Sequence, residues 1–380
     1  MRRKDGKPKL AARRNHPEYS YGFANHPDNL NTINPAWMGR PGVNSHSIVS
    51  FFAGCGGFDL GMLGGFKCFG REFRSLPFVI SYAVDNSRDA VDCYRLNLGN
   101  HIELGDLTEI NYSDIPSADI LIGGFPCQDF SSSGTKTGFA GERGKLYQTM
   151  IKYMNIYRPK LVVGENVAHL GRLAAGAYLK QILADIKNEG YKAAVWDLYG
   201  PDFGLPQSRR RLFIVGVRDD LPSFPRQPKP SHLGRYFTVD DALGDLEGIS
   251  DETICNQSQF FVATKATSGG GQGDHQNRRG EVAYCIRANA RGRIQFHYNL
   301  PRRLTVRECA RLQSFPDSFV FPFTTQRNLT LIGNAVAPLI GHCIGESLRH
   351  YLENTNSAES SSDDSCAYPI AEQKELSLAA

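Results

Sequence analysis

The sequence predicts an α/β fold in which a parallel sheet is covered by helices on both faces. Between residue 47 and about residue 218, short and nearly continuous apolar runs alternate with stretches that have the periodicity of amphipathic helices. Strands of this uniformly apolar kind, alternating with helices, are typical of a parallel sheet that is buried on both faces.

Five apolar runs are predicted to be the strands of this sheet. They are SIVSFF at 47–52, FVISYAV at 78–84, ADILIGG at 118–124, KLVVGEN at 160–166 and RLFIVGV at 211–217. The clearest helix lies between the last two runs and ends before Gly190. Its apolar positions recur at helical spacing and are Leu179, Ile182, Leu183 and Ile186.

The alternation ends near residue 219, and 219–303 has closely spaced prolines and few clear elements. A helix is predicted to begin at Thr305, because Glu308 three residues later completes a capping box. A last amphipathic helix is predicted over 334–352. The length of 380 residues allows two domains, or one large domain with an insertion.

Composition excludes several classes of protein. Hydrophobic residues make up 41% and charged residues 22%, which are ordinary values for a globular protein. No apolar run approaches the roughly 18 residues of a membrane helix, and the basic N-terminus lacks the apolar core of a secretory signal. The nine cysteines lie singly, without the spacing of a zinc site. We therefore expect reduced thiols, no bound metal and a cytoplasmic location.

The net charge of +4 conceals a strong segregation of charge. Residues 1–46 are basic and residues 353–380 are acidic, and both segments have the composition of disordered tails. Within the predicted folded part, positive charge gathers at 253–303 and at 209–211. These two places are therefore candidates for contact with an acidic partner.

A glycine-rich segment, FAGCGGFDLG at 52–61, follows the first predicted strand. Gly54, Gly56 and Gly57 would allow a tight turn and close approach to a ligand at a helix N-terminus. Asp85 ends the second strand and Asp106 lies where a further strand would end, as in a nucleoside cofactor site. Taken alone, the segment is equally compatible with a purely structural turn or a dinucleotide oxidoreductase.

Cys127 and Glu165 lie at the ends of two later strands, where open α/β sheets bind ligands. A thiolate can act as a nucleophile, and a neighbouring acid can protonate whatever the thiolate attacks. The alternatives are a buried free thiol for Cys127 and a helix start for Glu165, with Asn166 as its cap. Arg209 and Arg211 alternate along an incoming strand, where they could grip phosphates or form a solvated edge.

The order of these segments resembles the ordered motifs of DNA (cytosine-5-)methyltransferases. The resemblance covers about residues 47–350 and rests on FAGCGG, VDNS, GD, FPCQ, ENV, QSRRR, RECARLQSFPD and GNAV, in this order. It removes the oxidoreductase alternative. One departure is that the family usually has Asp near the start of the first block, where this chain has Ser50 or Phe51.

The resemblance implies S-adenosylmethionine as the cofactor and assigns roles to individual residues. Cys127 is similar to the nucleophile that adds to carbon-6 of cytosine, Glu165 to the acid at nitrogen-3, and Arg209 and Arg211 to arginines that line the active site. The implied cofactor-binding residues are Phe52, Gly54, Gly56, Gly57, Asp85, Asp106, Asn334 and Val336. The implied or expected DNA-binding residues are Gln128, Ser131, Arg278, Arg279, Arg287, Arg291 and Arg293.

These roles imply methylation of a flipped-out cytosine in a specific double-stranded DNA sequence. We expect a monomer, with a restriction endonuclease of the same site as a candidate partner. The alternatives are a tRNA methyltransferase of the same family and a non-catalytic DNA-binding relative. The expected domains are a catalytic domain, 47–218 with 330–352, and a recognition domain, 219–329. A solvated loop remains the alternative for the arginines of the recognition domain.

Overall fold

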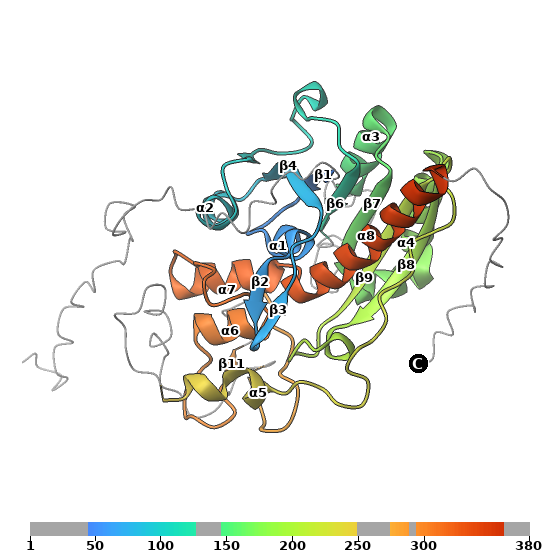
Figure 1. The fold of residues 1–380 in the computed structure, drawn as a ribbon. Coiled ribbons are helices and arrows are strands. Elements are labelled where there is room, and N and C mark those ends of the chain that lie inside the picture. The colour runs from blue at the N-terminus through green and yellow to red at the C-terminus, as the bar shows by residue number, and fades with distance from the viewer. Residues whose placement is uncertain (1–44, 127–145, 249–273, 289–293, 361–380) are drawn as a thin grey trace, which may run out of the picture.

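A computed structural model describes residues 45–126, 146–248, 274–288 and 294–360, with side chains up to residue 355. Its centre is a seven-stranded sheet with the order β5-β4-β1-β6-β7-β9-β8 (Figure 1). The strands are β1 His46–Phe51, β4 Phe78–Asp85, β5 Ile102–Leu104, β6 Ile120–Gly123, β7 Leu161–Val167, β8 Tyr191–Tyr199 and β9 Arg210–Arg218. The predicted α/β fold and all five predicted strands are confirmed, β5 is the further strand expected before Asp106, and β8 was not predicted.

One strand departs from the predicted parallel arrangement. β9 is antiparallel to both β7 and β8, while the pairs among β1, β4, β5, β6 and β7 are parallel. The prediction of a wholly parallel sheet is therefore wrong for β9. The connection 200–209, which contains the 3-10 helix η7 Gly200–Phe203, is too short for the crossover of a parallel pair, so the chain turns straight back.

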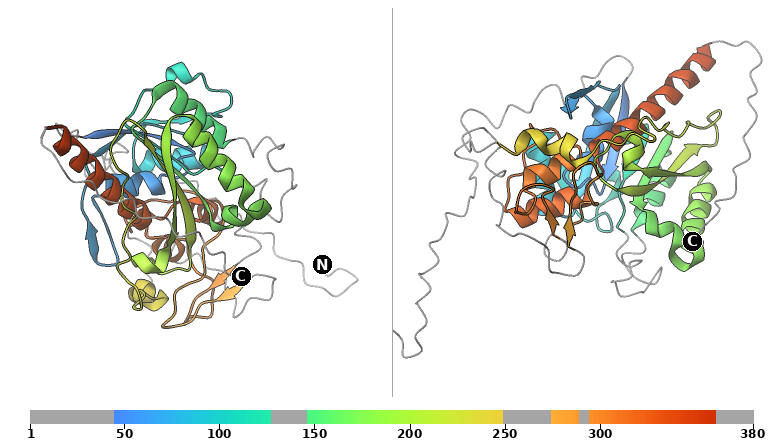
Figure 2. Two further views of the ribbon diagram at one scale, coloured as in Figure 1. Left: turned by 90° about the vertical axis from the view of Figure 1, so that its right-hand side faces the viewer. Right: turned by 90° about the horizontal axis from the view of Figure 1, so that it is seen from below.

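Helices cover both faces of the sheet, as predicted. α1 Gly57–Leu63, α2 Arg88–Asn97 and α8 Pro338–Ser360 belong to one hydrophobic cluster, and α3 Tyr147–Tyr157 and α4 Ala177–Asn188 to the other. Figure 2 (left) shows the sheet between α8 on one side and α3 and α4 on the other. The predicted apolar face of α4 is confirmed, because Leu179, Ile182 and Ile186 are buried.

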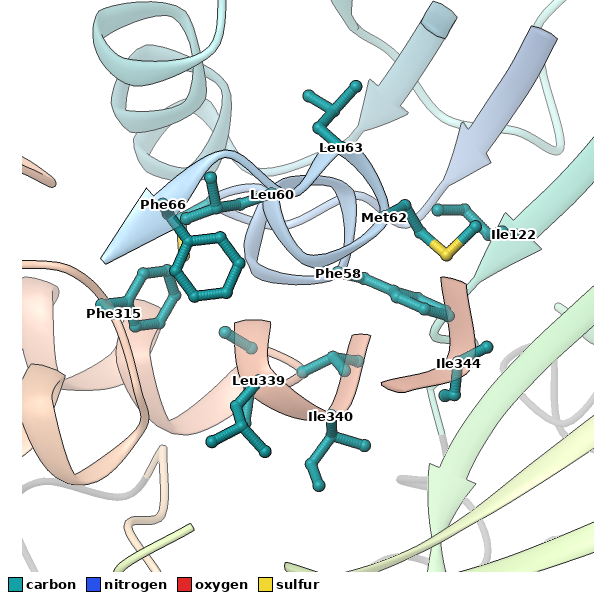
Figure 3. Packing of buried hydrophobic residues seen from close by; sticks show 14 of the residues in the cluster. Phe58, Leu60, Met62, Leu63, Phe66, Ile122, Phe315, Leu339, Ile340 and Ile344 are labelled. Atoms are coloured by element: carbon teal, nitrogen blue, oxygen red, sulfur yellow. The ribbon is translucent and has the colours of Figure 1, made fainter. Parts of the chain in front are cut away.

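The core beneath the glycine segment is formed by α1 and α8, which are about 280 residues apart in the sequence. Phe58, Met62 and Ile344 pack where these helices meet, and Ile122 of β6 lies beside them (Figure 3). This packing holds the start of α1, and with it the glycine segment, against the end of the chain.

A smaller part of the chain packs below the sheet in Figure 1 and contains short elements. They are the hairpin β2 Phe66–Cys68 with β3 Arg71–Phe73, the helices α5 Val239–Leu243, α6 Val306–Leu312 and α7 Thr325–Asn334, and the parallel pair β10 His275–Gln276 with β11 Gln295–Phe296. The remaining 3-10 helices are η2 Tyr112–Asp114, η6 Ala168–Gly176 and η8 Gly244–Leu246. The predicted capping box of α6 is confirmed between Thr305 and Glu308.

The end of the chain corrects two predicted boundaries. The helix predicted over 334–352 is confirmed as α8 but begins four residues later, at Pro338, because Asn334 is still the last residue of α7. α8 then continues to Ser360, so the first part of the expected disordered tail is helical. The ion pair of Arg349 with Glu353, one turn apart, extends the helix into this segment. None of the helices in the described ranges combines the length and hydropathy that a membrane span requires.

Candidate active site

The predicted catalytic and cofactor-binding residues on the strands of the sheet lie at or just beyond one edge of it. β1, β4, β5, β6 and β7 are parallel, so their carboxyl ends lie together, and antiparallel β9 begins at the same edge. The strand order reverses between β1 and β6. In open α/β sheets, this reversal opens the crevice in which ligands bind.

The glycine segment forms a tight turn between β1 and α1. Phe52 has a φ of 54°, a left-handed conformation that is strained for a side chain other than glycine. Gly57 packs against the last block, because a Cβ placed there would lie 2.3 Å from the carbonyl oxygen of Val336. The structure therefore brings together two segments of the predicted cofactor pocket that are far apart in the sequence.

The two predicted carboxylates differ in how firmly they are held. Asp85 accepts hydrogen bonds from the backbone N–H of Gly54 at 2.9 Å and of Ser87 at 2.8 Å. Burial raises the pKa of Asp85, and these two N–H groups oppose that rise. Asp106 is exposed and accepts from the hydroxyl of Thr108 at 2.7 Å, and Asn334 is exposed at the end of α7. Asp85 is thus built into the glycine turn, whereas the side chains of Asp106 and Asn334 are exposed.

Glu165 and Asn166 hold the segment that leads to Cys127. Cys127 itself lies outside the described residues, as do Gln128 and Ser131. A Cβ placed on Gly124 would lie 3.3 Å from Oε2 of Glu165, so this carboxylate lies over the backbone three residues before Cys127. Asn166 donates from Nδ2 to the carbonyl of Phe125 at 3.0 Å. Both residues lie in β7, so the alternative of a helix start at Glu165 is wrong.

Arg211 and Arg209 have different surroundings, although the sequence predicted the same role for both. Arg211 forms an ion pair with Glu165, with 3.0 Å between Nε and Oε1, and both side chains are largely buried. Arg209 is 4% exposed and donates to the backbone carbonyls of Ile286, Gly333 and Ala335. Burial lowers the pKa of Arg209 to about 10. The structure brings Arg211, but not Arg209, into an ion pair with Glu165.

Three of the later sequence blocks are joined by buried side-chain amides. Gln207 donates from Nε2 to the carbonyl of Leu312 at 2.7 Å and accepts from the N–H of Ile286 at 3.0 Å. Gln313 donates to the carbonyl of Ala335 at 2.7 Å. Together with Arg209, these bonds fix the start of β9, the end of α6 and the last block relative to one another.

The described arginines of the expected recognition surface are exposed. Arg278 lies 3.8 Å from Glu281, and Arg279 lies 3.8 Å from Glu247 and stacks over Tyr298. Arg287 forms no ion pair within the described part of the chain, and its backbone packs so closely on Gly333 that a Cβ there would lie 2.3 Å away. Arg291 and Arg293 lie outside the described residues.

Sequence reasoning missed several residues that build this edge. The sequence pattern predicts only a helix-capping role for Asn166, and it predicts no role for Gly124 or Gln207. The ENV and QSRRR blocks contain two of them, so proximity to a proposed catalytic residue was the available signal. A buried network of Ser50, Asp59 and Tyr94 below the glycine turn gave no signal in the sequence.

An open sheet with a glycine turn at its reversal point and a carboxylate on the next strand defines an α/β protein of the nucleoside-cofactor class. Residues 46–350 match the family model of C-5 cytosine-specific DNA methylases. The chain therefore belongs to this family, and it is an enzyme of the DNA (cytosine-5-)-methyltransferase class.

Individual relatives agree with this assignment. The chain is 34% identical to the type II methyltransferase M.NgoFVII of Neisseria gonorrhoeae, over 78% of this chain and 84% of the relative. It is 33% identical to M.NlaX of Neisseria lactamica, over 80% of this chain and 96% of the relative. Among solved structures, a putative DNA modification methyltransferase from an E. coli prophage has the same fold, with a TM-score of 0.60 at 19% identity, over 81% of this chain and all of that one.

Proposed function

We propose that this protein transfers a methyl group from S-adenosylmethionine to carbon-5 of a flipped-out cytosine in a specific double-stranded DNA sequence. We further propose that the modification protects the DNA from a cognate restriction endonuclease. The observation that carries the proposal is the position of Glu165, held by Arg211 over the backbone that leads to Cys127. The similar proteins are named type II methyltransferases, which supports DNA as the substrate and a restriction-modification system as the context.

The residues of this chain can overcome the low reactivity of cytosine at carbon-5. In the proposed reaction, the thiolate of Cys127 adds to carbon-6 and breaks the aromaticity of the ring. Glu165 contacts the ring at nitrogen-3, where protonation stabilises the electron-rich adduct. Carbon-5 then becomes nucleophilic enough to be methylated, and loss of its proton and of the thiol restores the ring. A base stacked in a duplex could not reach this buried carboxylate, so the target must be extruded.

The cofactor is proposed to lie between the glycine turn, Asp85 and the last block. When bound, S-adenosylmethionine supplies an electrophilic methyl group on its sulfonium. The residues fit such a ligand. No atom lies within 4 Å of a Cβ placed on Gly54, so there is open space beside the backbone of the turn, and Asp85 offers a buried carboxylate for ribose hydroxyls. Phe52, Asp106, Asn334 and Val336 are proposed to complete the pocket.

Replacing Asp85 by alanine is expected to weaken cofactor binding at least about tenfold. The change removes the proposed acceptor of the ribose hydroxyls, and a hydrogen bond to a charged group contributes about 1.5–3 kcal/mol. It also leaves the N–H groups of Gly54 and Ser87, which shape the turn, without their acceptor. Calorimetric titration with S-adenosylhomocysteine measures the effect, with Asp114→Ala as the control for a carboxylate outside the turn. Unchanged affinity would remove Asp85 from the proposed pocket.

Arginines of the recognition surface are expected to contribute to DNA affinity through phosphate contacts. Arg287→Ala should reduce the slope of log Kd against log salt concentration by about one, whatever the DNA sequence. Arg278 and Arg279 already have carboxylate neighbours, so we expect smaller effects from their replacement. Fluorescence anisotropy over a salt series measures the slopes. Arg74→Ala, an exposed arginine paired with Glu346, is the matched control, and equal slopes for both variants would contradict the assignment.

The substrate class is tested by incubating the protein with labelled S-adenosylmethionine and either DNA or tRNA. We expect label in DNA, and label in tRNA alone would refute the proposal. Bisulfite sequencing of DNA from cells that express the protein then identifies the methylated cytosine and its sequence context.

A further inference from the structure

We infer that Asp59 is a positioning residue for the cofactor, because its carboxylate fixes the Tyr94 ring on which the glycine turn rests. The inference rests on the proposed cofactor site and extends it to residues that have no expected contact with the ligand. Asp59 is a buried acid that has no role in the proposed reaction.

Asp59 lies in the first turn of α1 and is completely buried. Its Oδ1 accepts from the hydroxyl of Ser50 at 2.7 Å, and its Oδ2 accepts from the hydroxyl of Tyr94 at 2.7 Å. A buried carboxylate without good hydrogen bonds is costly, so these two bonds determine where the side chain lies. They connect β1, α1 and α2, which are the elements that enclose the glycine turn.

The Tyr94 ring is in direct contact with the backbone of the turn. A Cβ placed on Gly56 would lie 2.9 Å from Cδ2 of Tyr94 and 2.3 Å from Cδ1 of Leu98. Gly56 has a φ of 90° and precedes the first residue of α1, so the turn changes direction at the point where it touches the ring. A rotation of the ring would therefore disturb the backbone that we propose to face the cofactor.

The same hydroxyl extends the network to His101, whose Nε2 lies 2.9 Å from Oη of Tyr94. When Asp59 is ionised, Tyr94 donates to Asp59 and His101 donates to Tyr94. When Asp59 is protonated, Asp59 donates to Tyr94 and Tyr94 donates to His101. Both patterns satisfy the same heavy atoms, so the ring stays in place in either state.

Burial raises the pKa of Asp59 to about 6, and the hydrogen bonds from Tyr94 and Ser50 oppose the rise. The folded protein therefore holds this proton more tightly than the unfolded chain does. Stability from this site is complete below the ordinary carboxyl pKa and is lost as the pH rises to about 6.

The network also accounts for the departure from the family pattern at the first block. The resemblance expects an aspartate near the start of that block, where this chain has Ser50 or Phe51. Ser50 instead donates to Asp59, so α1 supplies the buried carboxylate in place of β1. Carboxylates at both positions would place two acids in contact in the core, where only one could ionise readily.

The test measures S-adenosylhomocysteine binding by calorimetry and, separately, the unliganded Tm of four variants. Asp59→Leu and Tyr94→Phe break the link to the ring and are expected to weaken binding about tenfold. Tyr191→Phe is the matched control, because Tyr191 is also buried but donates to the Pro159 carbonyl at the far edge of the sheet. It should lower the Tm by a similar amount to Tyr94→Phe without changing the affinity.

Asp59→Asn is the conservative variant. Its amide can accept from Ser50 and donate to Tyr94, which reproduces the protonated pattern, so binding should stay within about threefold of wild type. Because asparagine does not titrate, its advantage in Tm over wild type should grow from pH 4 to about pH 6 and then level off.

Two results would overturn the inference. One is equal weakening by Tyr94→Phe and Tyr191→Phe, which would indicate a general loss of stability. The other is wild-type affinity in Tyr94→Phe, which also decides the question if Asp59→Leu does not fold. If the wild-type protein itself fails to bind the probe, the proposed cofactor is wrong, and this outcome is distinct from a failure of the Asp59 inference.

Discussion

A Cys127→Ser protein is expected to bind cofactor and DNA normally but to lose methyl transfer by at least about 10³-fold. The proposed reaction begins with a nucleophile at carbon-6, and a serine hydroxyl ionises far less readily than a thiol near neutral pH. Transfer of label from S-adenosylmethionine to DNA measures the rate. Titration with S-adenosylhomocysteine and an electrophoretic shift of DNA measure the two binding steps separately.

A trapping experiment tests whether the thiol itself bonds to the base. With 5-fluorocytosine at the target position, the fluorine cannot leave as a proton does, so the adduct should survive denaturation in wild type and be absent in Cys127→Ser. Cys343→Ser, on α8, is the control for loss of an unrelated thiol and should retain both activity and trapping. Full methylation by Cys127→Ser would refute the covalent mechanism.

The sequence was sufficient for the elements whose signals are local. The apolar runs of β1, β6, β7 and β9 predicted their strands because these strands are largely buried on both faces, and β4 kept an apolar run although Ser81 is exposed. The capping box at Thr305 and Glu308 depends on two residues of one turn, and it formed as predicted. β8 was missed because this edge strand has mostly half-buried positions, which leave no continuous apolar run.

The sequence did not predict the burial of side chains whose surroundings come from distant segments of the chain. Arg209 and Arg211 are identical residues two positions apart, and their alternation predicted a common exposure. Arg209 precedes β9 and is enclosed by carbonyls of residues 286, 333 and 335, which lie more than 70 residues away. Nothing near position 209 encodes those partners. The same reason explains why Asp59 was overlooked, since its partner Tyr94 lies on another helix.

Replacing Glu165 by glutamine is expected to lower kcat about 10²-fold to 10³-fold while cofactor and DNA affinity stay close to wild type. Glutamine has nearly the same volume, and its carbonyl oxygen can lie beside Arg211 as the carboxylate oxygen does. It cannot transfer a proton to nitrogen-3, so the adduct at carbon-6 loses its stabilisation. Single-turnover methylation with saturating cofactor isolates this step from product release.

The partner of Glu165 provides a second way to examine the same step. Arg211→Ala leaves a buried carboxylate with neither its cation nor a polar neighbour, so it should lower the rate and reduce the Tm by more than Glu165→Gln, which keeps a polar oxygen beside the guanidinium. Glu189→Gln is the matched control, because Glu189 is an exposed carboxylate that accepts from Asn155. If Glu165→Gln turns over as fast as Glu189→Gln, protonation at nitrogen-3 is not the contribution of Glu165. Its carboxylate would then serve to hold Arg211 at the edge of the sheet.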